Sequence, residues 1–162
     1  MTSTVEIQLV KGLSHVHAIG RQSIRLLAAA TQFARDEEIV ELYRDLLVQA
    51  EGRTVIVADR LEAYGARPSD VREPADSGLT AAAHSVPDTP IRLAETAFAL
   101  GNHEAASYRM LRELAERAGD EVTASVADRI LEQVETAAEL VAGTFDRAVE
   151  VTLSPERGPF AG

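Results

Sequence analysis

The chain has 162 residues, 46% of them hydrophobic, which is enough for one compact domain with a sizeable core. It contains no cysteine, which excludes a disulfide scaffold, a thiolate metal site and a cysteine nucleophile. A formal net charge of −10 argues against nucleic-acid binding, which depends on a basic face. No apolar run reaches the roughly 18 residues of a membrane span, and the first residues lack a signal-peptide pattern, so we expect a cytoplasmic protein without a membrane partner.

The composition favours helices, because Ala, Leu, Arg and Glu are abundant and aromatic residues make up only 4%. The first predicted helix covers about residues 4–34. Apolar and small residues recur along it in a 4-3 alternation, which is typical of the buried seam of a helix in a bundle. These residues are Leu9, Leu13, Val16, Gly20, Ser23, Leu27, Ala30 and Ala34.

The second predicted helix begins after Asp36, whose side chain suits an N-cap, and ends before Gly65, which suits a C-terminal stop. Glu37 and Glu38 are well placed at the positive end of its dipole. We expect its inward line to consist of Tyr43, Leu47, Ala50, Thr54, Val57, Leu61 and Tyr64.

A long connection follows, because residues 66–77 show no period and contain two prolines. We expect a short helix at 79–84, a second break at 86–90, and a third long helix to about residue 118. Thr89 is its predicted N-cap, with Pro90 in the first turn, where the missing N–H costs nothing. Its expected inward residues are Leu93, Ala97, Leu100, Glu104, Ser107, Leu111 and Leu114.

Gly119 is expected to end the third helix and Asp120 to cap a fourth, which continues to about residue 153. Its predicted seam consists of Val126, Ile130, Val134, Ala137, Val141 and Phe145. Residues 1–153 therefore predict one all-α domain, a ferritin-like four-helix bundle with a short extra helix in the long crossover. We expect residues 154–162 to form a disordered tail, with recognition of a protein partner as an alternative role.

Residues 103–120 resemble the third-helix signature of the ferritin-like DUF892 family, the stress-associated YciE/YciF type. Residues 42–65 resemble its second helix, and residues 19–22 and 78–79 match weaker features of the family. The resemblance covers about residues 12–145. It implies a bundle interior that holds two metal ions on glutamate and histidine side chains.

Most of the ligand positions that the resemblance implies carry other residues here. The family's ligands fall on Gly20 in the first helix, on Leu46, Val48 and Glu51 in the second, and on Gly101 and Asn102 in the third. The resemblance therefore implies a degenerate site with no expected cofactor. The remaining candidate ligands for iron or manganese are Glu51, Glu104, Glu135, Glu139 and His103.

Each of these residues also has an interpretation without metal. Glu104 could be a carboxylate paired with an arginine or hydrogen-bonded to Tyr108, and Glu51 could face solvent. His103 suits a polar surface, and Glu135 and Glu139 suit an acidic stripe. If Glu104 has no cation beside it, Glu104→Gln should be tolerated.

Gly20 and Gly101 each lie in mid-helix, where glycine costs about 1 kcal/mol relative to alanine. The sequence leaves two explanations open. Either the first and third helices approach closely there, or a small cavity marks the place of a lost ligand.

Two functions from different classes follow. The first is a non-catalytic binding or structural protein, and the second is an iron or manganese oxidoreductase or storage protein with a reduced ligand set. We also expect a homodimer, because Val55, Ile56 and Val57 spread apolar surface over about 200° of the second helix. A monomer mass in light scattering would contradict the dimer.

Overall fold

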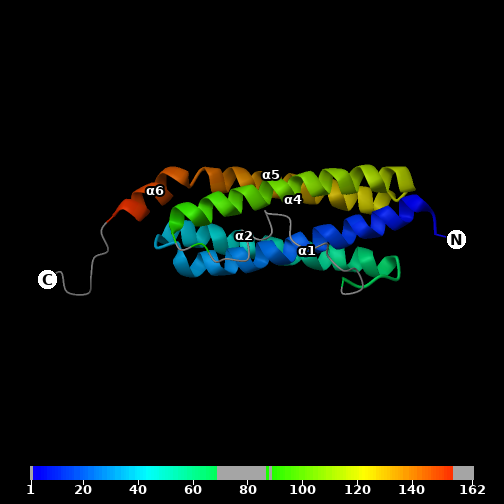
Figure 1. Ribbon diagram of the computed structural model, residues 1–162, viewed down its shortest axis with the longest axis horizontal. Helices are drawn as coiled ribbons and strands as arrows, with labels where there is room; N and C mark the ends of the chain where they lie inside the picture. The colour runs from blue at the N-terminus through cyan, green and yellow to red at the C-terminus, as the bar shows by residue number, and fades with distance from the viewer. Residues whose placement is uncertain (1, 69–86, 88, 155–162) are drawn as a thin grey trace.

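The computed structural model describes residues 2–68, 87 and 89–154. Its helices are α1 (Thr4–Phe33), α2 (Glu37–Ala63), α4 (Pro90–Ala118), α5 (Glu121–Ala142) and α6 (Phe145–Leu153), and the described residues contain no strand. The four long helices α1, α2, α4 and α5 lie side by side, and the start of α1 and the end of α6 lie at opposite ends of the bundle (Figure 1). The predicted all-α four-helix bundle is confirmed. The expected short helix at 79–84 and most of the tail lie outside the described residues.

The helix boundaries follow from capping residues that the sequence predicts. Asp36, Thr89 and Asp120 each accept a hydrogen bond from a backbone N–H three residues on, as N-caps do. Gly65 and Gly119 adopt φ values of 67° and 71° directly after α2 and α4. Glycine takes this left-handed conformation without a steric penalty, so both helices end where expected.

The prediction of one continuous fourth helix is wrong. The chain turns at Gly143 and Thr144, where the Thr144 N–H bonds to the Val141 carbonyl and the Thr144 hydroxyl donates to the same oxygen at 2.7 Å. The inward seam of α5 therefore ends at Val141. Phe145 begins α6 instead, is 38% exposed, and packs edge-on against Phe98 of α4 with ring centroids 5.5 Å apart.

The helices pack in the order expected for two antiparallel hairpins. α1 packs against α2 and α4, α4 also packs against α5 and α6, and the contact between α2 and α5 is the sparsest around the bundle. The buried side chains form two apolar clusters, one at each end. Among the described helices, none is both long and apolar enough to cross a membrane.

The predicted inward lines hold for α1 but shift in α2. All eight seam residues of α1 are buried. In α2 the buried face contains Leu46 and Arg53, whereas Leu47 and Thr54, which we expected there, are only half-buried. Successive side chains on a helix point about 100° apart, so Leu47 and Thr54 lie at the flank of α2, one position away from its buried face.

Candidate functional site

A polar cluster lies where the two apolar clusters meet. Arg53 of α2 and Glu104 of α4 are only 5% and 2% exposed. The Arg53 Nη2 donates to Glu104 Oε1 at 3.3 Å, and the Ser23 Oγ of α1 donates to Glu104 Oε2 at 3.1 Å. Both oxygens of the buried carboxylate are thus engaged, one of them by a cation. Burial and the nearby Glu104 charge raise the pKa of Tyr108 on the next turn of α4.

A cavity of about 40 Å³ lies beside this ion pair. All four long helices line it, with Ser23, Leu26, Leu27, Leu46, Arg53, Ala97, Leu100, Gly101, Glu104, Val134, Ala137, Ala138 and Val141. Among the described residues, the buried Nε and Nη1 of Arg53 have no hydrogen-bond partner. A volume of this size holds one or two water molecules, not an organic cofactor.

The residues of this layer do not fit a two-metal site. Such sites in ferritin-like bundles use a glutamate from each of two helices and a Glu-x-x-His pair from each of the other two. Here α1 supplies Ser23, α4 supplies Glu104, and α5 supplies Val134 and Ala138. In α2 the buried pairs with i, i+3 spacing are Tyr43 with Leu46 and Ala50 with Arg53, and neither is a Glu-x-x-His pair.

Among the described residues that line this layer, Glu104 is therefore the only carboxylate, and it is paired with a guanidinium, which has no lone pair for a metal. Within residues 2–68, 87 and 89–154, no three His, Asp or Glu side chains come together in a way that could hold a metal ion.

Val48 and Glu51, on which we expected the family's second-helix ligands to fall, lie on the outer face of α2. Val48 is 67% exposed and Glu51 is also exposed, so neither faces the interior. The buried face of α2 runs through Leu46, Ala50 and Arg53.

The other candidate ligands lie apart from Glu104. Glu135 pairs with Arg109 on the surface, and Glu51 and Glu139 are exposed. His103 is half-buried, with its ring against that of His15 in α1. Glu104 is thus the only one of the five that belongs to the interior layer, and it forms the ion pair with arginine that we considered as one alternative.

The two mid-helix glycines have different neighbours from those expected. A Cβ on Gly20 would lie 2.7 Å from the Thr54 Oγ1, so α1 approaches α2 there and not the third long helix. A Cβ on Gly101 would lie 3.4 Å from the Cβ of Ala138 in α5. Gly101 also lines the 40 Å³ cavity, so close packing explains Gly20 and a cavity accompanies Gly101.

Gly20→Ala should destabilise the fold by about 1–3 kcal/mol, because the new methyl group meets a hydroxyl that is held by its bond to the Ala50 carbonyl. Thr54→Ala in the same chain removes that hydroxyl and should restore much of the loss. The matched control is Gly52→Ala on exposed α2 surface with no neighbour within 4 Å, which should stabilise by about 0.5–1 kcal/mol. Urea unfolding measures all three. Equal effects of the two glycine substitutions would contradict the close contact.

Arg53 is the interior residue that sequence reasoning missed. A signal was present, since Arg53 follows Ala50 by three residues and precedes Val57 by four, and both of these are on the predicted inward line. Charged residues are rarely fully buried unless paired, so a charge on a seam indicates a partner on another helix. Glu104, the charged residue on the predicted seam of the third long helix, is that partner.

A second polar cluster joins the end of α2 to the start of α5. Arg60 forms an ion pair with Asp120 at 3.0 Å and donates from its Nε to the Thr123 hydroxyl at 2.9 Å. The Tyr64 hydroxyl also donates to Asp120. Burial raises the pKa of Asp120, but hydrogen bonds from Thr123, Tyr64 and Arg60 outweigh it and lower the pKa to about 2. Burial and Asp120 raise the pKa of Tyr64 to about 12.

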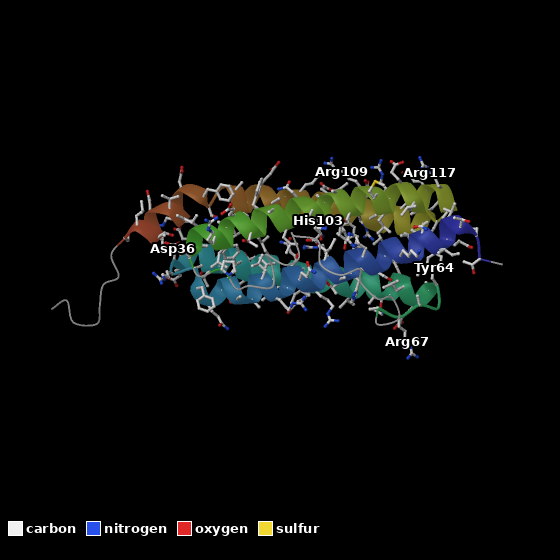
Figure 2. All side chains as sticks on the ribbon, viewed as in Figure 1. Asp36, Tyr64, Arg67, His103, Arg109 and Arg117 are labelled. Carbon is white, nitrogen blue, oxygen red and sulfur yellow. The ribbon has the colours of Figure 1, made fainter. Side chains whose placement is uncertain are left out.

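Tyr64 is labelled near the end of the bundle that carries the N-terminus (Figure 2). The second cluster therefore lies at one end of the bundle, away from the layer of Glu104. The side chains of this cluster hydrogen-bond to one another, and Asp120 caps α5, so the cluster joins α2 to α5 and has a structural role.

Three solved structures share this fold. A protein from Xanthomonas campestris superposes with a TM-score of 0.76 at 21% identity, covering 93% of this chain and 97% of that one. A ferritin-like, diiron-carboxylate protein from Bacillus anthracis gives 0.73 at 11% identity, covering 88% and 99%. A two-domain protein from Anabaena variabilis with DJ-1/ThiJ/PfpI-like and ferritin-like domains gives 0.70 at 14% identity, covering 99% of this chain and 42% of that one.

No curated protein matches the sequence. The family model of the domain of unknown function DUF892, however, matches residues 4–153, nearly the whole chain. The resemblance stated from residues 103–120 is thereby confirmed. This chain belongs to the DUF892 family.

Proposed function

We propose that this ferritin-like bundle has lost the two-metal site and acts as a non-catalytic binding or structural protein. The observation that carries the proposal is the buried Arg53–Glu104 pair. The Arg53 guanidinium supplies the positive charge beside Glu104 that a metal ion would supply in a two-metal site. A divalent cation beside Glu104 would have to displace this guanidinium, and the described residues that line the layer offer the cation no second carboxylate or imidazole.

On the same proposal, folding does not depend on metal. A cluster of several buried glutamates would repel one another until a cation bound, and that cation would stabilise the folded state by mass action. One carboxylate that is already paired has no such requirement. The stress-associated role that the family resemblance implies would then rest on binding or assembly, without redox chemistry.

We expect the thermal midpoint to stay unchanged within error after EDTA treatment and after addition of iron or manganese. The measurement is a thermal melt with elemental analysis of the purified protein. A retained iron or manganese site would instead raise the midpoint, by about 2–4 °C for each kcal/mol of binding energy in a chain of this size. Stoichiometric iron that disappears in Glu104→Ala would favour the oxidoreductase or storage function and overturn the proposal.

A further inference from the structure

Two histidines from different helices meet on the outside of the bundle, apart from the interior layer. His15 of α1 is exposed and His103 of α4 is half-buried. Their ring centroids lie 5.7 Å apart with the planes at 85°. His103 is labelled midway along the bundle, in the region where α4 runs over α1 (Figure 2). We propose that His15 and His103 form a surface site for a late first-row divalent cation, Cu²⁺ or Zn²⁺.

The ring separation suits two imidazoles on one ion. A metal–nitrogen distance of about 2.0–2.1 Å places each ring centroid about 3.2 Å from the metal. Two such rings can therefore be at most about 6.4 Å apart, and 5.7 Å corresponds to an angle of about 125° at the ion. The edge-to-face pose requires one ring to turn about χ2, and this torsion has a broad, shallow profile for histidine.

Among the described residues, the surroundings of the two rings favour nitrogen-binding metals. One turn from the two histidines lie Ala18 and the exposed Lys11 on α1 and Ala99 and Ala106 on α4, none of which brings a carboxylate. The Ser107 hydroxyl is engaged with the His103 carbonyl. Water would complete the coordination. A site to which the described residues bring two imidazoles and no carboxylate follows the order in which Cu²⁺ binds most tightly and Mn²⁺ and Fe²⁺ bind weakly.

The test is a Cu²⁺ titration of the full, metal-free chain, followed by calorimetry and by the nitrogen couplings in its electron paramagnetic resonance spectrum. We expect one Cu²⁺ per chain with two coupled imidazole nitrogens. His15→Asn and His103→Asn should each weaken binding at least tenfold and leave one coupled nitrogen. The control is Glu51→Gln on the exposed face of α2, which should leave affinity and spectrum unchanged.

Unchanged affinity in either His15→Asn or His103→Asn, or a loss of binding in Glu51→Gln, would overturn the site. His15 is exposed, so its variant remains informative even if His103→Asn disturbs packing. Glu104→Gln separates this inference from the proposed function, since the Cu²⁺ site should survive that change. Iron bound through Glu104 would overturn the proposed function and leave the histidine site standing.

Discussion

Arg53→Met should destabilise the protein by about 3–5 kcal/mol, because it leaves the Glu104 carboxylate buried without its cation. Methionine fills much of the space of the arginine stem, so the loss would report the charge and not a large cavity. Ser23 still donates to one oxygen of Glu104, but a neutral hydroxyl does not replace the ionic partner. Urea unfolding at about pH 7 measures the change in the free energy of unfolding.

Glu104→Gln should also destabilise the fold, at the lower end of that range. The tolerance expected from the sequence assumed that no cation accompanies Glu104, and the structure supplies one in Arg53. Glutamine can still accept one hydrogen bond from Arg53, but the guanidinium then remains charged in the interior. Its Nε and Nη1 already lack protein partners, so the cost of its burial depends strongly on the carboxylate.

The double variant Arg53→Met, Glu104→Met distinguishes the stability contribution of the ion pair from the cost of leaving one buried charge without its partner. Replacing a buried ion pair with apolar side chains of similar volume is often neutral or stabilising, so the double variant should be more stable than Arg53→Met alone. Arg109→Met is the matched control, since Arg109 pairs with Glu135 on the surface and should cost under about 1 kcal/mol. Equal losses for Arg53→Met and Arg109→Met would contradict the importance of the buried pair.

Local signals in the sequence account for most of the fold. The N-caps Asp36, Thr89 and Asp120 and the glycines after α2 and α4 act within one turn of the chain, so their effect is visible in the sequence. The break before α6 is not visible in this way. The apolar period continues through Phe145, and the turn depends on Thr144 bonding back to Val141 and on the contact of Phe145 with Phe98.

The interior site could be predicted only in part. Periodicity places Glu104 on an inward seam, and it does so for Ala50 and Val57 as well. It does not give the level at which one helix meets another, so the partner of Glu104 could not be named and the second-helix ligands were assigned to the exposed Val48 and Glu51. The close approach behind Gly20 is similarly a property of two helices, and glycine alone does not indicate which helix is the neighbour.

Asp120→Asn should lower the free energy of unfolding by about 2 kcal/mol at about pH 7. Asparagine is as good an N-cap as aspartate, so the variant keeps the cap of α5 and removes the charge that Arg60 and Tyr64 contact. The pKa of Asp120 is about 2 in the folded protein against an ordinary value of 3.8. The folded state therefore binds this proton less readily than the unfolded state does.

This difference fixes the pH range of the effect. A lowered folded-state pKa contributes stability that is fully present above about pH 5 and is lost as the pH falls from about 4 toward 2. The stability gap between the natural protein and Asp120→Asn should therefore close in acid, while other carboxylates titrate in both proteins and cancel. Urea unfolding at several pH values measures the gap, with the exposed Asp59→Asn as a control that should stay within about 0.5 kcal/mol of the natural protein. A gap that is constant down to about pH 2 would show that Asp120 stabilises the junction of α2 and α5 by some means other than its charge.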